Sequence, residues 1–247
     1  MTPTPNKNGK NAIGRHASSL DPTFPLMTTL TPDLIETMHA DQAGVIDLLP
    51  EHLARLSFSA RTLGYPYPGE SAIVQAIRVA CAAHPDTSLR VRLLLSKTGA
   101  LSVQAVPLGP LVGTPLIGLS PVVLDSQECL LQHKTTYRPW YDSTTEWLST
   151  HSAYFDQIYL NERQELCEGS RSNIYLRLQN VWLTPPLTSG LLGGTMRKRL
   201  LSSGLVQEHV LHLSDVPHAQ AIRLSNGLRG WFDVKPDASL LPGHFLP

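Results

Sequence analysis

The sequence predicts an α/β fold in which strands and helices follow one another in mixed order (mixed α+β). Two observations support this prediction. Segments in which apolar residues alternate with polar ones are typical of strands, and other segments repeat their apolar residues at helical spacing. Both kinds of segment are short and follow one another in mixed order, with no internal repeat. That order favours sheets with packed helices over a solenoid or a helical bundle.

The elements before residue 108 begin with a predicted hairpin, because Asp41 and Gly44 supply a turn between two apolar segments. Pro50 suits the start of a helix, and residues 97–99 suit a tight turn between two strands. In order, the predicted elements are strands at 34–38 and 45–48, helices at 49–60 and 71–83, and strands at 89–95 and 101–106.

The composition changes between Pro107 and Pro121, where prolines and glycines are mixed among apolar residues, and this change predicts a linker. The predicted organisation is a loose arm at 1–25, an N-terminal α+β domain at 26–108, a linker at 109–120 and a C-terminal domain at 121–247. In the last of these, strands are predicted at 156–160, 174–178, 181–183, 206–213 and 222–224, and helices at 195–203 and 215–221.

The charge and the cysteines narrow the class of protein. Lys plus Arg number 20 and Asp plus Glu number 20, so the chain lacks the net positive charge that binds nucleic acid or an anionic membrane. Three widely spaced cysteines fit no metal-ligand spacing and indicate reduced thiols in a cytoplasmic protein. No apolar run could span a bilayer, and none follows the basic residues near the N-terminus. We therefore expect no metal site, membrane segment or secretory signal.

Two segments could supply the reacting groups. An isolated lysine such as Lys134 is usually a solvated surface charge. A lysine that bonds covalently to a carbonyl must instead be partly desolvated, and the apolar residues at 129–131 are compatible with burial. Glu168 precedes small polar residues and a strand, which suits either a plain hairpin turn or a carboxylate that keeps a pyridine nitrogen protonated.

Two further segments could hold a phosphate. The glycine-rich turn at 189–194 leads into a helix that starts at Thr195, and a helix N-terminus offers free N–H groups and a favourable dipole. The turn matches neither common nucleotide motif. Arg55 is either a surface arginine whose stem packs on apolar neighbours or a phosphate clamp.

The order and spacing of these segments resemble the class IV aminotransferase family and, within it, the aminodeoxychorismate lyases. The resemblance extends from about residue 33 to residue 234. The segments that carry it are LIETM at 34–38, HLARL at 52–56, HKTT at 133–136, YD at 141–142, NER at 161–163, EGSRSN at 168–173, TPPL at 184–187, GLLGGTMR at 190–197 and SNGLRGW at 225–231.

The resemblance implies a two-domain fold type IV enzyme, with pyridoxal 5′-phosphate in a cleft beside a C-terminal pseudo-barrel domain. Lys134 would carry the cofactor and then move protons, with Thr37 near the substrate. Glu168 would pair with the pyridine nitrogen, and Arg55 would bind the phosphate. The other cofactor-binding residues that it implies are Ser172, Asn173, Thr195, Met196, Asn226 and Gly227.

The reaction implied is conversion of 4-amino-4-deoxychorismate to 4-aminobenzoate and pyruvate, a step of folate biosynthesis, by a homodimer. Two alternatives stay open. One is a transaminase for D-amino or branched-chain amino acids, because the protein decides which bond breaks. The other is a binding protein that kept the fold. Gly193 and Gly227 depart from the family, which often has proline at the first position and Ser or Thr at the second.

Overall fold

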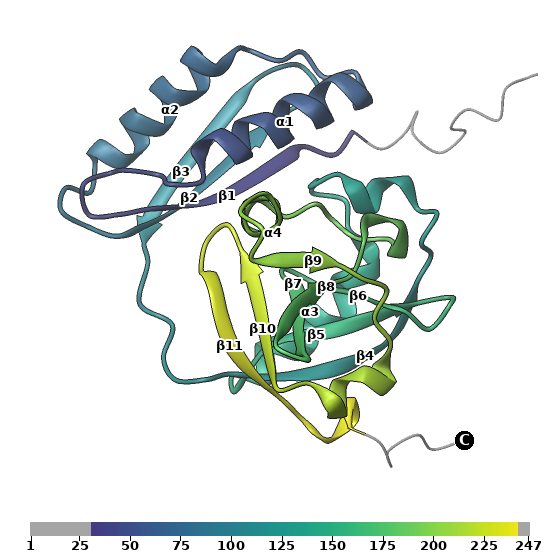
Figure 1. The fold of residues 1–247 in the computed structure, drawn as a ribbon. Helices are drawn as coiled ribbons and strands as arrows, with labels where there is room; N and C mark the ends of the chain where they lie inside the picture. The colour runs from purple at the N-terminus through teal and green to yellow at the C-terminus, as the bar shows by residue number, and fades with distance from the viewer. Residues whose placement is uncertain (1–30, 242–247) are drawn as a thin grey trace, which may run out of the picture. The chain divides into compact units, whose positions relative to one another are not determined.

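The computed structural model of the chain describes residues 31–241, and the arm predicted at 1–25 lies outside them. The described part holds a three-stranded sheet near its start and an eight-stranded sheet after it (Figure 1). With the helices packed on them, these sheets form the mixed α/β fold that the order of short segments predicted.

The first sheet is antiparallel, with the strand order β1-β2-β3. Its residues alternate between the two faces: Leu89, Val91 and Leu93 are fully buried, whereas Arg90 and Arg92 are exposed on the opposite face. The buried face packs against two helices. The elements are β1 (Leu34–Ala40), α1 (Leu49–Leu63), α2 (Glu70–Ala82), β2 (Leu89–Leu95) and β3 (Leu101–Pro107).

Both predicted helices and the β2–β3 pair are confirmed, but the hairpin predicted at 34–48 is wrong. Strand β1 pairs with β2, which is about fifty residues further along the chain. The Asp41 carboxylate accepts hydrogen bonds from the backbone N–H groups of Ala43 and Val45. This closes a tight turn, in which Gly44 has a φ of 77°, and the chain then enters α1 directly.

The second sheet closes on itself, because β10 pairs with both β11 and β7. Strands β8 and β9 extend this sheet beyond the closed ring. A cluster of buried apolar side chains, which come from positions between Ile117 and Leu240, forms the core of this part of the chain. The elements are β4 (Leu116–Leu124), α3 (Asp142–Thr150), β5 (Tyr154–Asn161), β6 (Leu166–Gly169), β7 (Asn173–Leu178), β8 (Val181–Thr184), α4 (Thr195–Ser202), β9 (Val206–Glu208), β10 (Ala221–Asn226) and β11 (Gly230–Pro236).

The second half differs from its prediction in several places. The strand predicted at 206–213 ends at Glu208, and the helix predicted at 215–221 is a 3₁₀ helix over Leu213–His218 that begins earlier, where His212 and Asp215 cap each other. Strand β4 begins inside the range predicted as a linker. Strands β4, β6 and β11 and helix α3 were not predicted. The division into domains stays a prediction.

The segment around Lys134 is attached to the first sheet. The backbone N–H of Ile35 donates to the Lys134 carbonyl at 2.8 Å, and the N–H of Thr136 donates to the Asp33 carbonyl at 2.8 Å. Leu34 and Thr135 complete this short antiparallel bridge. Lys134 therefore lies beside β1, far from it in sequence.

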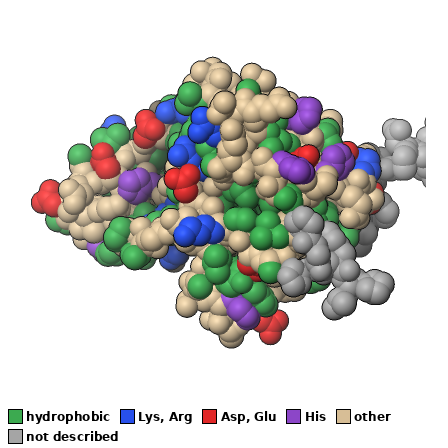
Figure 2. Space-filling model, turned by 60° about the horizontal axis from the view of Figure 1, so that its bottom comes forward, with side chains coloured by type: hydrophobic (Ala, Val, Ile, Leu, Met, Phe, Trp, Pro, Cys, Tyr) green, Lys and Arg blue, Asp and Glu red, His purple; other side chains and the backbone are tan. Residues whose placement is uncertain are grey.

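The surface gives no sign of a large single-charge patch on the face that Figure 2 draws, where acidic, basic and apolar side chains are interspersed. Among residues 31–241, no helix combines the length and the apolar character that crossing a membrane requires.

Candidate active site

A cavity of about 350 Å³ brings together almost all the residues that the sequence predicted as a site. Met196 is the exception, because its side chain lines a different cavity. The lining comprises Ile35, Thr37, Arg55, Arg90, Arg92, Lys134, Arg138, Glu168, Arg171, Ser172, Asn173, Leu192, Gly194, Thr195, Ser225, Asn226, Gly227 and Leu228.

Lys134 lines this cavity, and among residues 31–241 its amine makes no hydrogen bond or ion pair with another side chain. Burial lowers the pKa of Lys134 to about 7, and the nearby Arg138 and Arg55 guanidinium groups act in the same direction. The carboxylates of Glu36 and Glu168 oppose the shift. A large share of neutral amine is therefore present at neutral pH, which a nucleophilic lysine requires.

Glu168 is buried at the end of β6 and is held by three donors. The Tyr141 hydroxyl donates to it at 2.6 Å, the Leu192 backbone N–H at 3.1 Å and the Asn173 amide at 3.4 Å. Burial raises the pKa of Glu168 to about 7, and the hydrogen bond from Tyr141 is the largest of the effects that limit the rise. The carboxyl group can therefore gain or lose a proton near neutral pH.

Arg55 is held by a carboxylate that sequence reasoning missed. Its Nε and Nη2 donate to the two oxygens of Glu36 at 2.9 and 2.6 Å, and His52 Nδ1 lies 2.5 Å from the same carboxylate. Burial alone would raise the pKa of Glu36, but Arg55 and His52 lower it to about 2. The edge of the guanidinium formed by Nε and Nη2 thus faces Glu36. The remaining nitrogen, Nη1, donates to the Gly193 carbonyl at 3.4 Å.

Two glycines make a close-fitting wall where helix α4 starts. A Cβ on Gly227 would lie 2.6 Å from the His52 ring and 2.7 Å from the Thr195 hydroxyl, and a Cβ on Gly194 would lie 2.0 Å from the Asn173 amide oxygen. The N–H groups in the first turn of α4 have no partner within the helix. This wall of bare backbone fits the phosphate of the cofactor that the resemblance implies.

The departure at Gly227 has a physical reason in this structure. The space that a serine or threonine side chain would fill is taken by His52 and Thr195. At Gly193 an added Cβ would lie 3.7 Å from the Leu187 side chain, which is an ordinary contact without a clash.

The remaining predicted residues are bonded within the protein. The Ser172 hydroxyl donates to Asp156 at 2.7 Å, the Asn173 amide donates to the Leu192 carbonyl at 2.9 Å, and the Asn226 amide donates to the Arg171 carbonyl at 3.2 Å. These bonds shape the cavity wall. Met196 lines a different cavity, so it could contact the cofactor only through its backbone N–H, which lies in the first turn of α4.

Asp156 organises the loop between β6 and β7, and no sequence signal marked it. This buried carboxylate accepts bonds from the backbone N–H groups of Ser170 and Arg171 and from the hydroxyls of Ser170 and Ser172. A Cβ on Gly169 would lie 2.3 Å from it. The loop is therefore held in one conformation beside Glu168.

Four arginines of the cavity were also missed: Arg90, Arg92, Arg138 and Arg171. The signal for two of them is the alternation in strand 89–95, which places Arg90 and Arg92 on one face. Register pairs Arg92 with Thr37 across the β1–β2 ladder, so both side chains meet the cavity.

We expect Gly227→Ser to weaken cofactor binding, because the added side chain must displace the His52 ring or Thr195 at the start of α4. Overpacking of this kind also destabilises a folded protein by about 1–3 kcal/mol. Titration of the cofactor-free protein with pyridoxal phosphate, followed by absorbance, measures the affinity. Gly109→Ser is the control, since a Cβ on Gly109 meets nothing within 4 Å. Equal affinities of the two variants would contradict the close fit.

The lowered pKa of Lys134 predicts how its reactivity depends on pH. In cofactor-free protein, the rate of acetylation of Lys134 by acetic anhydride should rise with pH and level off above about 7, because the amine is then neutral. Peptide mass spectrometry measures the rate at this residue. A rate that kept rising to about pH 10, as for a lysine free in water, would contradict the burial argument.

Comparisons with known proteins agree with this geometry. A family model described as amino-transferase class IV matches residues 33–236. A Schizosaccharomyces pombe protein named "Putative aminodeoxychorismate lyase" is 32% identical over 204 residues, which cover 80% of this chain and 86% of that protein.

Solved structures show the same fold. A Mesorhizobium loti structure, named "Putative amino-acid aminotransferase", is 33% identical with a TM-score of 0.78, covering 83% of this chain and 100% of that one. A branched-chain amino acid aminotransferase of Escherichia coli is 20% identical with a TM-score of 0.72, covering 84% of this chain and 78% of that one.

Proposed function

Because this chain belongs to the class IV aminotransferase family, whose members depend on pyridoxal 5′-phosphate and share the fold type IV architecture, we propose that it is an aminodeoxychorismate lyase. It would convert 4-amino-4-deoxychorismate to 4-aminobenzoate and pyruvate. The S. pombe relative supports this reaction by its name.

The observation that carries the choice of substrate is the charge of the cavity. The guanidinium groups of Arg90, Arg92, Arg138 and Arg171 line it, and Glu168 is the single acidic residue among the lining residues. The cofactor phosphate, a monoester, carries about −1.5 to −2 charges. The positive charge of the arginines that line the cavity exceeds this negative charge. A substrate with two carboxylates, such as 4-amino-4-deoxychorismate, complements this excess better than a branched-chain amino acid does.

The positions of these residues support a role for each of them. The neutral amine of Lys134 would remove the proton from the ring carbon that bears the substrate nitrogen. Bound pyridoxal phosphate supplies an electron-withdrawing ring that makes this proton acidic. Glu168 would hold a proton at the pyridine nitrogen, and Arg55 with the first turn of α4 would anchor the phosphate.

Loss of the side chain completes the reaction. The bond between the ring carbon and the enolpyruvyl oxygen breaks, the oxygen takes up a proton, and the enol becomes pyruvate while the ring becomes aromatic. Thr37 lines the cavity on β1, beside the segment of Lys134, and would assist this proton transfer.

An assay of products tests the proposal. Purified protein loaded with pyridoxal phosphate should form 4-aminobenzoate and pyruvate in equal amounts from 4-amino-4-deoxychorismate without any keto acid. The M. loti relative favours a second candidate, an amino-acid aminotransferase. Amino transfer from D-amino or branched-chain amino acids that requires a keto acid, with no 4-aminobenzoate formed, would replace the lyase by that candidate.

Two further parts of the proposal concern the setting of the enzyme. The reaction would place it in the supply of 4-aminobenzoate for folate biosynthesis, in the cytoplasm. The family resemblance also implies a homodimer, and sedimentation velocity of the purified protein tests that state.

A further inference from the structure

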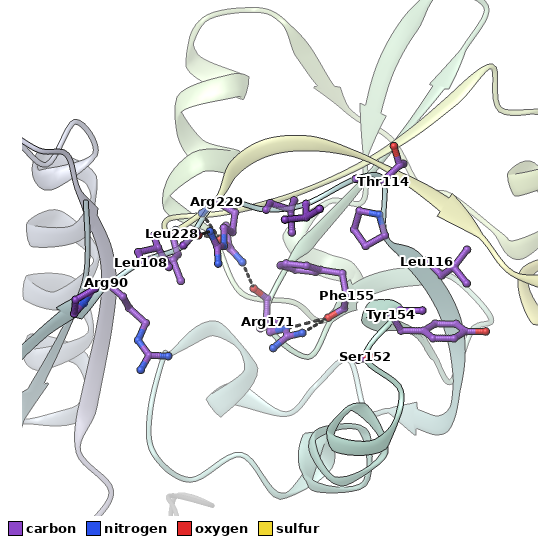
Figure 3. A pocket seen from close by; sticks show the side chains of 18 of the residues that line it. Arg90, Leu108, Thr114, Leu116, Ser152, Tyr154, Phe155, Arg171, Leu228 and Arg229 are labelled. Carbon is purple, nitrogen blue, oxygen red and sulfur yellow. Dashed lines mark hydrogen bonds between the residues drawn. The ribbon is translucent and has the colours of Figure 1, made fainter. Parts of the chain in front are cut away.

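A second, larger cavity adjoins the proposed catalytic one. Its volume is about 890 Å³, and it lies between the segment after β3 and the start of β5 (Figure 3). Four residues line both cavities: Arg90, Arg171, Asn226 and Leu228. The two spaces therefore meet at this point.

The chemistry of the second cavity suits an anion with an apolar body. Three arginines line it, Arg90, Arg171 and Arg229, and no Asp or Glu is among its lining residues. Most of the other lining residues are apolar, and Phe155 is among them. Figure 3 shows the Arg90 guanidinium extending from its strand into the open space, with Arg171 and Arg229 across that space.

Arg171 is already fixed in place without a ligand. Its Nε and Nη2 donate to the Phe155 carbonyl, and its guanidinium lies 4.7 Å from the centre of the Phe155 ring. Its backbone N–H is held by Asp156. Arg90 lines both cavities, and among residues 31–241 its guanidinium makes no hydrogen bond or ion pair. A preorganised guanidinium and an uncommitted one thus lie at the junction, which is suited to a carboxylate.

We propose that Arg90 and Arg171 form a carboxylate subsite for the ring carboxylate of the substrate, which lies across the ring from the amine. This inference rests on the proposed function. The catalytic cavity is at the small end of the size range of ligand sites, and the cofactor takes part of it. The far end of a six-membered ring whose amine reaches Lys134 therefore extends toward the junction. The product 4-aminobenzoate keeps the same carboxylate and binds the same subsite.

The test measures binding of two ligands that differ in one charge. Calorimetry on the cofactor-loaded protein compares 4-aminobenzoate with 4-aminobenzamide, which has the same shape but no charge. We expect 4-aminobenzoate to bind about ten- to a hundredfold more tightly, as charge-assisted hydrogen bonds contribute about 1.5–3 kcal/mol. In Arg90→Gln and Arg171→Gln this preference should fall to a few-fold, and Arg90→Glu should bind the amide better than the acid.

The matched control is Arg78→Gln, an exposed arginine on α2, which should keep the full preference. A preference that Arg90→Gln and Arg90→Glu leave unchanged would overturn the subsite, even if the lyase assay succeeds. A preference lost in these variants supports the subsite. If the variants lose the preference but the natural protein forms no 4-aminobenzoate in the lyase assay, the proposed reaction is wrong. The two arginines would then still bind the carboxylate of a cyclic ligand.

Discussion

Lys134→Ala should lower kcat for the lyase reaction by about 10⁴-fold or more, because one amine both carries the cofactor and moves the proton. The same loss is expected if the enzyme is a transaminase, so this variant tests the reacting group and not the substrate. Steady-state assays of pyruvate and 4-aminobenzoate measure the effect. Added ethylamine should restore part of the activity, since a small amine can enter the space that the lysine side chain leaves.

The control for this experiment is Lys235→Ala. Lys235 is an exposed residue of β11, and its replacement should leave kcat unchanged. Circular dichroism should show the same fold for both variants. Full activity of Lys134→Ala would remove the basis of the proposed mechanism.

Glu36→Ala should lower the free energy of unfolding by about 3–5 kcal/mol, the range found when one partner of a buried ion pair is removed. The change leaves the Arg55 guanidinium and the His52 ring in a buried site without their shared carboxylate. Urea denaturation of the cofactor-free protein measures the loss. Glu146→Ala, which removes an exposed carboxylate from α3, should change stability by less than about 0.5 kcal/mol.

The effect of Glu36 should depend on pH in a defined direction. Its pKa is about 2 in the folded protein against an ordinary value of 4.5, so the folded state favours the ionised form. The stabilisation is fully present above about pH 4.5 and is lost as the pH falls toward 2. Natural protein and Glu36→Ala should therefore converge in stability over that window. A difference that stayed constant down to pH 2 would contradict the ion-pair account.

Glu36→Ala should also weaken cofactor binding, because the carboxylate positions Arg55 beside the start of α4. Glu36→Gln keeps a hydrogen-bond acceptor for the guanidinium and should retain more of the affinity. If both variants bound pyridoxal phosphate as the natural protein does, Arg55 would not depend on Glu36 for its position.

Local patterns in the sequence were enough to predict several helices and strands of this protein and the segments of its candidate site. Alternation in β2 and helical spacing in α1 and α2 are set by which residues can be buried, and that signal is present in the chain itself. The segments around Lys134, Glu168 and Arg55 could be recognised for the same reason: each role needs a particular residue type at a particular place in the order of the family.

Only the tertiary structure decided the contacts between segments that are far apart in sequence. The β1–β2 pairing replaced the predicted hairpin because burial of β1 against α1 and β2 outweighs the local turn signal. Strand β6 looks like a polar turn and becomes a strand only because its neighbours supply hydrogen bonds on both sides. The Glu36–Arg55 pair, the Asp156 loop and the junction of Arg90 with Arg171 likewise depend on distance in space. A periodic pattern shows which face of an element is buried, but not which distant side chain meets it there.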